Sequence, residues 1–469
     1  MKNALAVMFV MLFAAAAHAQ KEAPLPKDLP PYGTQPSFQP PEVKVEKFEN
    51  GLTLWLVAQP GLPTVSFRIV VLGGLALDPT DRPGLSELLA RALNQGTKTR
   101  NAKQIAEEIQ SAGGDLSVRA DRDAIFVSTS VLSSKTELAA GLLADVLENA
   151  SFPDSEVALA KRNLSDSLRQ REAQPGFQAN RALARVLFGS GPYSVIAPTQ
   201  DSLGKMTAQE LRQEFGRRFR PDQAILVAVG DFDPAKMSTL VKEKLGGWKA
   251  PAAPTAGVNA KPSGPAPHQV TFVARPNSVQ TTLVLAGFGP LRSDPDYEGA
   301  EVADAIYGGT FTSRLVTNIR EDKGYTYSPG SNLATLRQAA TLRTQADVRN
   351  AVTGASLNEI IYELNRMATT SPTEEELTRA KRSLLGIEAI LLQSRGAVAG
   401  ELADLWLNGL GPDAIGRYNR KINATTAEDV DAIARKYFPA SHMTIVAVGE
   451  EKVIRDALAP FALPMETPK

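Results

Sequence analysis

The chain has 469 residues, of which 43% are hydrophobic and 22% charged, a composition typical of a globular protein rather than a disordered or membrane-embedded one. Lys plus Arg and Asp plus Glu each number 51, so no net charge directs the chain toward nucleic acid or an anionic membrane surface. The absence of cysteine excludes disulfides and thiolate metal ligands, and the length suits two domains of about 200 residues each.

The first 19 residues have the pattern of a secretory signal. Lys2 supplies the charged start, a short apolar run follows, and Ala17-His18-Ala19 forms a small-x-small cleavage site. The apolar run is too short to span a bilayer core of ~30 Å. Residues 20–42 are rich in proline and predict an extended arm. We therefore expect an exported, periplasmic protein that is not held in a membrane.

The first half mixes strand-like and helix-like segments without strict alternation. Hydrophobic periodicity predicts strands at 43–48, 52–57, 65–72, 116–120, 124–131 and 224–229, and helices at 84–97, 102–112, 135–149, 154–172 and 208–219. Asn50-Gly51 predicts a hairpin between the first two strands. Such a mixture is typical of an α+β domain whose helices pack on one face of a mostly antiparallel sheet.

A Pro/Ala/Gly-rich linker at 250–267 divides the chain, and the second half repeats features of the first. Thr207-Ala208-Gln209-Glu210-Leu211 returns at the same offset as Thr426-Ala427-Glu428-Asp429-Val430, as does Ala228-Val229-Gly230 at 447–449. The sequence therefore predicts two homologous α+β halves, at 43–249 and 268–465.

The segment GLSELLARALNQGT at 84–97 carries the first motif. Leu85, Leu88 and Leu89 fall at helical spacing, which indicates an amphipathic helix with one buried stripe. Glu87 and Arg91 stand four residues apart on this helix, the spacing of an intrahelical ion pair.

This frame resembles the active-site helix of the pitrilysin/insulinase family, G-L-A-H-x-x-E-H-x-x-x-x-G-T, in which both His bind zinc and the Glu is the general base. The three corresponding positions here are Glu87, Ala90 and Arg91, and the family's third zinc ligand, a glutamate on the next long helix, corresponds to Ser167. The resemblance implies a conserved helix that binds no metal or other cofactor. A hard cation held by Glu87 and Asp166 is an open alternative, less favoured than a salt-bridged arrangement.

A second motif, YGGTFTSRLVTNIREDKGYTYS at 307–328, resembles the second-domain signature of the same family. The resemblance implies that Arg320 and Tyr327 reach the active site from the side opposite the zinc, and that a glycine-rich loop at Gly308 and Gly309 lets a substrate backbone come close. A guanidinium offers fixed donors to peptide carbonyls, and a phenol hydroxyl can stabilise an oxyanion. An interface ion pair and a strand aromatic are the structural alternatives, and Tyr325 is the nearest competing tyrosine.

The resemblance further implies that the halves close like a clamshell and that two chains pair to enclose a chamber. We therefore predict a non-catalytic, substrate-gripping subunit of a periplasmic two-chain zinc peptidase acting on peptides. An H-x-x-E-H partner subunit would supply the zinc. Two alternatives remain open: a peptide-binding or chaperone-like chamber protein without proteolysis, and an assembly subunit.

Overall fold

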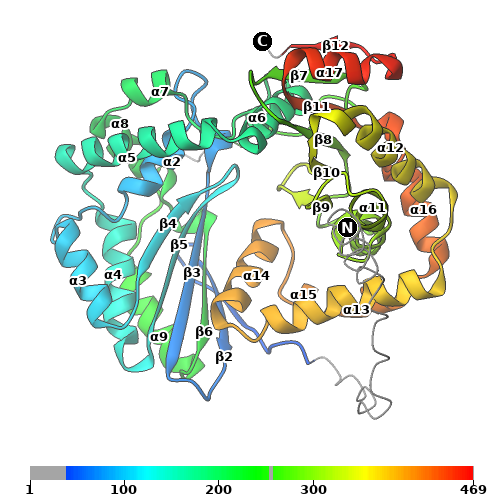
Figure 1. Cartoon of the computed structure of the whole chain (residues 1–469). Helices are drawn as coiled ribbons and strands as arrows, with labels where there is room; N and C mark the ends of the chain where they lie inside the picture. Colours follow the sequence, from blue (N-terminus) through cyan, green and yellow to red (C-terminus); the bar gives the residue numbers. More distant parts are fainter. Residues whose placement is uncertain (1–38, 253–256, 468–469) are drawn as a thin grey trace, which may run out of the picture. The chain divides into compact units, whose positions relative to one another are not determined.

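The structure, a computed structural model, describes residues 39–252 and 257–467. The predicted signal and most of the proline-rich arm lie outside these residues. The strands form two six-stranded sheets (Figure 1). The first, in the order β1-β2-β6-β3-β5-β4, contains β1 (Lys44–Lys47), β2 (Thr53–Ala58), β3 (Thr64–Leu72), β4 (Leu116–Ala120), β5 (Ala124–Leu132) and β6 (Ala224–Gly230). The second, in the order β12-β7-β11-β8-β10-β9, contains β7 (Val270–Ala274), β8 (Gln280–Phe288), β9 (Gly330–Thr335), β10 (Ala340–Arg349), β11 (Thr444–Gly449) and β12 (Met465–Glu466).

Helices connect the strands in both halves. Those of the first half are α2 (Leu85–Ala92), α3 (Ala102–Ser111), α4 (Thr136–Asn149), α5 (Asp154–Glu172), α6 (Pro175–Phe188), α7 (Gln200–Lys205), α8 (Ala208–Arg218) and α9 (Pro234–Leu245). Those of the second half are α10 (Tyr297–Asp304), α11 (Arg314–Val316), α12 (Thr353–Thr369), α13 (Glu374–Leu391), α14 (Arg395–Leu407), α15 (Ala414–Ala424), α16 (Ala427–Tyr437) and α17 (Glu451–Leu458). Two π-helical turns, η5 (Ala305–Gly309) and η6 (Thr317–Asp322), flank α11.

The two halves have the same strand order over five strands, β2-β6-β3-β5-β4 in the first sheet and β7-β11-β8-β10-β9 in the second. In each order the first pair is parallel and the other three pairs are antiparallel. The sixth strands differ, because β1 forms a hairpin with β2 whereas β12 comes from the end of the chain and runs parallel to β7. The predicted fold class, two related α+β halves with mostly antiparallel sheets, is confirmed.

The first-motif helix is shorter than the predicted 84–97, because α2 ends at Ala92. The amide Nδ2 of Asn94 donates to the carbonyl of Leu116 at 3.1 Å, which ties the segment after the helix to the edge strand β4. Gly84 precedes the helix with φ +85°, and a Cβ there would come within 2.4 Å of Pro198. Only glycine fits this start, since the left-handed backbone and the close contact both exclude a side chain.

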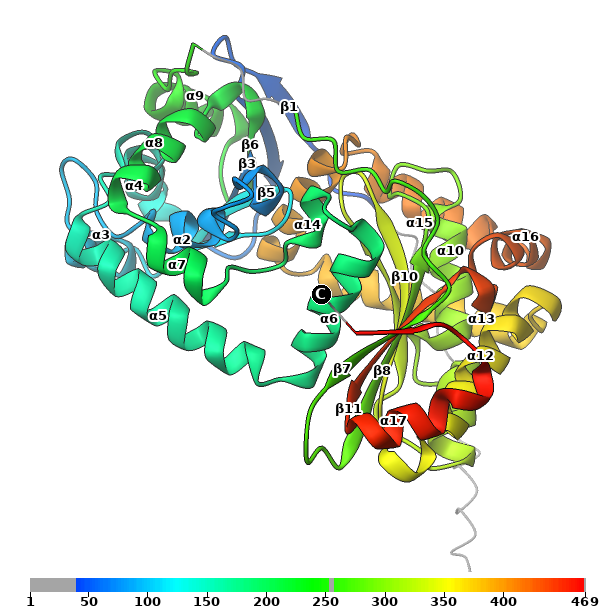
Figure 2. The same cartoon turned by 90° about the horizontal axis from the view of Figure 1, so that it is seen from above.

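Each half covers the other's sheet with one helix. The helix α6 of the first half packs on β7, β8 and β11 of the second sheet, and α14 of the second half packs on β3 and β6 of the first sheet. Figure 2 shows α5 running into α6 beside β7 and β8. The apolar residues of α6 belong to one hydrophobic cluster with the sheet residues Val284, Ala286, Val446 and Val448. We call α6 and α14 the exchanged helices.

The start of α14 is held by Arg395, whose side chain is buried against the segment between β2 and β3. Its Nη1 donates to the carbonyl of Thr64 at 2.9 Å and to the Thr64 hydroxyl at 2.6 Å, and its Nη2 donates to the carbonyl of Gln59. A charged donor bound to buried carbonyls gives stronger hydrogen bonds than a neutral one. This guanidinium therefore joins the two halves at the edge of the first sheet.

We expect Arg395→Met to lower the free energy of unfolding by about 2 kcal/mol, because the half-buried carbonyls of Gln59 and Thr64 lose a charged donor, although the Thr64 carbonyl still accepts from the backbone N–H of Asp231. Arg395→Lys should recover only part of the loss, since an ammonium cannot reproduce the planar fork. Denaturant unfolding gives both values, with the exposed Arg382→Met on α13 as the control. Equal stability of the Arg395 and Arg382 variants would show that the contact does not hold the halves together.

Candidate functional site

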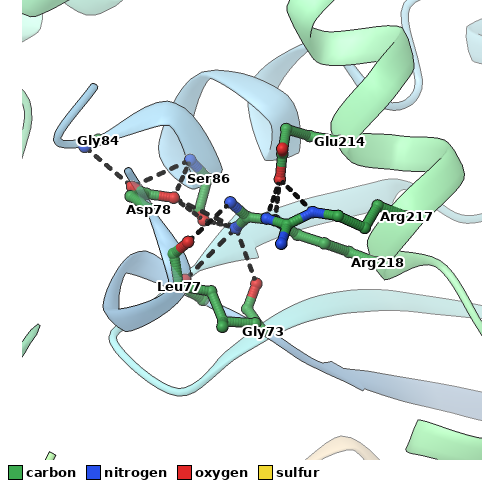
Figure 3. Close-up of polar contacts among 9 residues, drawn as sticks. Gly73, Leu77, Asp78, Gly84, Ser86, Glu214, Arg217 and Arg218 are labelled. Atoms are coloured by element: carbon green, nitrogen blue, oxygen red, sulfur yellow. Dashed lines mark hydrogen bonds and ion pairs between the residues drawn. The ribbon is translucent and has the colours of Figure 1, made fainter. Parts of the chain in front are cut away.

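The first-motif helix α2 is fixed by a buried network at its N-terminus (Figure 3). The carboxylate of Asp78 accepts hydrogen bonds from the backbone N–H of Gly84 at 2.9 Å and of Ser86 at 3.0 Å. Arg218, on α8, is 1% exposed and donates to Ser86 Oγ at 2.5 Å and to Asp78 at 3.2 Å. Its Nε also donates to Glu214 at 2.6 Å. The network holds α2 against α8.

Burial raises the pKa of Asp78 to about 6, although the Arg218 guanidinium and the hydrogen bonds from Ser86 act in the opposite direction. The carboxylate also lies at a helix N-terminus, where a negative charge is favourable. The network therefore serves the placement of α2, and none of its side chains points to a catalytic role.

The positions that correspond to the zinc ligands hold an ion-pair cluster. The Glu87 side chain is 14% exposed, and its Oε1 accepts from Arg171 Nη2 on α5 at 3.0 Å and from Arg91 Nη2 at 3.4 Å. The family's zinc connects these same two helices. Here a carboxylate between two guanidinium groups makes that connection, so Glu87 is already neutralised by protein charges.

The other corresponding positions offer no zinc donor. Ala90 and Arg91 line a cavity of about 310 Å³ between α2, β4 and α5, and Ser167 lies half-buried on α5. Asp166 is exposed and pairs with Arg169 at 2.7 Å, so each carboxylate of the alternative cation site is bound to arginine. Within the ranges 39–252 and 257–467, no group of three or more acidic or imidazole side chains is placed to hold a metal ion. The donor set does not fit zinc.

The second motif brings Arg320 and Tyr327 together. The Arg320 guanidinium lies 4.7 Å from the ring centre of Tyr327 and 4.7 Å from that of Phe311, so it stacks between two aromatic rings. Its Nε also pairs with the neighbouring Glu321 at 3.1 Å. Tyr327 is 80% exposed and Phe311 is 75% exposed. Arg320 lies on the π-helical turn η6, and such turns are frequent at functional sites.

Arg320 and Tyr327 line one cavity of about 290 Å³ with Gly308 and Gly309. The two glycines end the π-helical turn η5, where we expected a loop. A Cβ on Gly308 would come within 2.5 Å of Ser331 Oγ, and one on Gly309 within 2.7 Å of Asp304 Oδ2. Internal packing thus requires both glycines, and the same absence of side chains leaves the cavity wall open.

Asp304 lies behind this glycine wall. Its carboxylate is buried and accepts a hydrogen bond from Ser331 Oγ at 2.5 Å. Burial raises the pKa of Asp304 to about 7. The cavity with Arg320 and Tyr327 is therefore backed by a carboxyl whose pKa lies well above its usual range.

The fold and the two motifs define the class: a two-half α+β protein of metallopeptidase type. A family model described as insulinase (peptidase family M16) matches residues 54–192, and one described as the peptidase M16 inactive domain matches residues 205–384. Together they span more than half of the chain. The chain belongs to the insulinase family of peptidases.

Curated relatives carry the name zinc protease. A protein named as an uncharacterized zinc protease of Mycobacterium leprae is 27% identical over 75% of this chain and 80% of its own length. The zinc protease YmxG of Bacillus subtilis, also named as uncharacterized, is 23% identical over 83% of this chain and 94% of its own length.

Two solved structures share the fold. A peptidase M16 inactive domain from Pseudomonas fluorescens superposes with a TM-score of 0.80 at 24% identity, over 87% of this chain and 98% of that one. A protease from Helicobacter pylori superposes with a TM-score of 0.83 at 16% identity, over 88% and 100%. No helix in the part of the chain that the structure describes is long and apolar enough to cross a membrane.

We expect the purified chain to hold no stoichiometric zinc after dialysis and to cleave no unfolded peptide, because Glu87 is the only potential ligand at the four positions and two arginines already bind it. Metal analysis and a digestion assay measure both properties. One tightly bound zinc per chain, or cleavage that a chelator stops, would contradict this expectation.

A gain-of-function variant provides the matched control. Glu87→His, Ala90→Glu, Arg91→His and Ser167→Glu together restore the family's donor set on the same two helices. This variant should bind zinc if α2 and α5 keep the family spacing.

Asp304 gives the protein a pH-dependent stability. Its pKa of about 7 in the folded state exceeds the ~3.9 of an unfolded aspartate, so between these pH values the folded chain keeps a proton that the unfolded chain has released. The free energy of unfolding should therefore fall as pH rises from about 4 to about 7, by a few kcal/mol at most.

The Asn side chain of Asp304→Asn is uncharged at both pH values, so the free energy of unfolding of this variant should change less with pH. Denaturant unfolding at about pH 4.5 and about pH 7.5 measures the difference between the two proteins. If the free energies of unfolding of the wild type and Asp304→Asn differ by the same amount at both pH values, Asp304 ionises with an ordinary pKa.

Proposed function

We propose that this chain is the non-catalytic, substrate-gripping subunit of a periplasmic two-chain zinc peptidase that acts on peptides. The observation that carries the proposal is the contrast between the two motifs. The α2 positions have lost their metal donors to an ion-pair cluster, whereas Arg320 and Tyr327 still meet at an open cavity. A chain with no role in peptide handling has no physical need for such a site.

The Arg320 arrangement suits an extended peptide. Stacking between Phe311 and Tyr327 fixes the guanidinium plane and leaves its edge for peptide carbonyls. Two exposed aromatic rings are unfavourable on an isolated surface, and they are enriched where a protein binds a partner or ligand. The Tyr327 hydroxyl belongs to the more exposed of the two rings and is available to a reacting group.

The chemistry of cleavage is assigned to a partner subunit with an intact H-x-x-E-H motif. That subunit would hold the zinc and the general base, as the name zinc protease of the curated relatives suggests. This chain would enclose and position the peptide. The export pattern of residues 1–19 supports a periplasmic complex.

Reconstitution tests the proposal. Co-expression with an H-x-x-E-H family subunit should give a complex that stays together in size-exclusion chromatography and cleaves peptides. Two well-folded chains that migrate separately at micromolar concentration would overturn the subunit assignment. A stable complex that binds peptides without cleaving them would favour the chaperone-like alternative.

In the active complex we expect Tyr327→Phe to lower kcat by about a hundredfold, the effect of losing one donor worth ~3 kcal/mol to a developing oxyanion. The phenyl ring still stacks on Arg320, so this variant isolates the hydroxyl. Arg320→Ala should also raise KM, because the guanidinium binds substrate before the transition state as well as in it. Tyr325→Phe is the control and should be nearly silent. Wild-type kinetics for Tyr327→Phe would show that this tyrosine takes no part in the chemistry.

A further inference from the structure

A third cavity, of about 310 Å³, lies between the two halves and away from both motifs. Its walls come from the turn between β4 and β5, from the exchanged helix α6, and from the β9–β10 hairpin. Most of the lining is apolar, with Leu183, Leu187 and Phe188 on α6. Two arginines also line it, Arg122 from the β4–β5 turn and Arg343 from β10.

Neither arginine has a carboxylate partner. In the described part of the chain, no acidic oxygen lies within 4.0 Å of Arg122 or Arg343. Arg343 donates from Nη2 to the neutral Gln345 side chain, and its Nε is buried without a hydrogen-bond partner. Arg122 lies 6.0 Å from the Phe188 ring centre. Burial lowers the pKa of both guanidinium groups, which means that their charge is poorly solvated.

The carboxylates closest to Arg122 along the chain are bound elsewhere. Asp123 accepts from the Tyr193 hydroxyl and, at 2.9 Å, from the backbone N–H of Arg337 in the β9–β10 hairpin. Asp121 accepts two backbone N–H groups of its own turn and lies 3.7 Å from Arg119. Both acids thus hydrogen-bond to other groups and attract Arg122 only from beyond ion-pair distance.

A half-buried guanidinium without an ion-pair partner costs free energy, so folding alone does not explain two of them at one cavity. We propose that Arg122 and Arg343 bind a carboxylate of a peptide. The apolar side chains of the peptide next to this carboxylate would pack against α6. A guanidinium matches a carboxylate in bidentate geometry, and the cavity volume suits a short peptide stretch rather than a folded domain. The inference rests on the proposed peptide-binding function and names its substrate class: peptides with an acidic side chain or a free C-terminus.

Fluorescence anisotropy with the full-length chain tests the inference. The probes are labelled peptides of one apolar sequence in three forms: an uncharged peptide amide, the same amide with one internal glutamate, and the free C-terminal acid. We expect at least one carboxylate form to bind about tenfold more tightly than the uncharged amide. Tighter binding of the glutamate-containing amide would show that the site takes a side-chain carboxylate. Tighter binding of the free acid would show that it takes the C-terminal carboxylate.

The variants assign the preference to the cavity. Arg122→Gln and Arg343→Gln should each remove most of the tenfold preference, whereas Arg349→Gln, an exposed arginine on the same strand β10, should keep it. Without peptide, Arg343→Gln should melt at the wild-type temperature or higher, because it removes a half-buried charge that has no ion-pair partner.

The outcomes separate the two proposals. Equal binding of all three peptides would overturn the carboxylate site and leave peptide binding intact. Absence of binding for every peptide would overturn peptide binding itself. A lower melting temperature of unliganded Arg343→Gln, with the peptide preference unchanged, would show that the arginine is structural and would also overturn the site.

Discussion

The central strands β6 and β11 of the two sheets are apolar and buried on both faces, and that constraint shapes the rest of the structure. All residues of β6 and of β11 are buried, so a single layer of helices cannot keep either sheet out of water. The helices of each half cover one face, and the exchanged helices α6 and α14 cover the other. The halves therefore fold against one another, and the chain from Pro40 onwards forms one compact unit. The cavity lined by Arg122 and Arg343 exists because α6 crosses to the second sheet.

The loss of the zinc donors has not loosened α2. Three separate polar contacts hold this helix: Asp78 at its N-terminus, Glu87 with Arg171 across to α5, and Asn94 to the edge strand β4. In a metal-binding relative a bound ion would connect α2 with α5, so the ion pair of Glu87 replaces a structural function of the metal along with its ligands. This explains how the helix keeps its place while its chemistry has changed.

Local pattern predicted the strands of the first half and most of its helices, since α5 at Asp154–Glu172 and β4 at Leu116–Ala120 match their expected bounds. Pattern also located the second motif, because its residues are close together in sequence. The helices α6 and α14 were not predicted, and hydrophobic periodicity does not indicate which sheet a helix will cover. The Asp78–Arg218 pair and Phe311 were missed for the same reason: their meaning lies in contacts that form only on folding. Gly308 and Gly309 were read as a loop, whereas packing against Ser331 and Asp304 places them on a π-helical turn.

The buried arginines Arg218 and Arg314 differ in their partners from the half-buried Arg122 and Arg343, and the difference is informative. Arg218 has Asp78 and Glu214, and Arg314 holds Glu376 in a bidentate pair at 2.7 and 2.9 Å that lowers the pKa of this glutamate to about 2. These arginines are matched within the fold, so their charge stabilises helix contacts. Arg122 and Arg343 are left without such partners, although acids stand next to one of them in sequence. This contrast with Arg218 and Arg314 supports the proposal that Arg122 and Arg343 meet a negative charge from outside the chain.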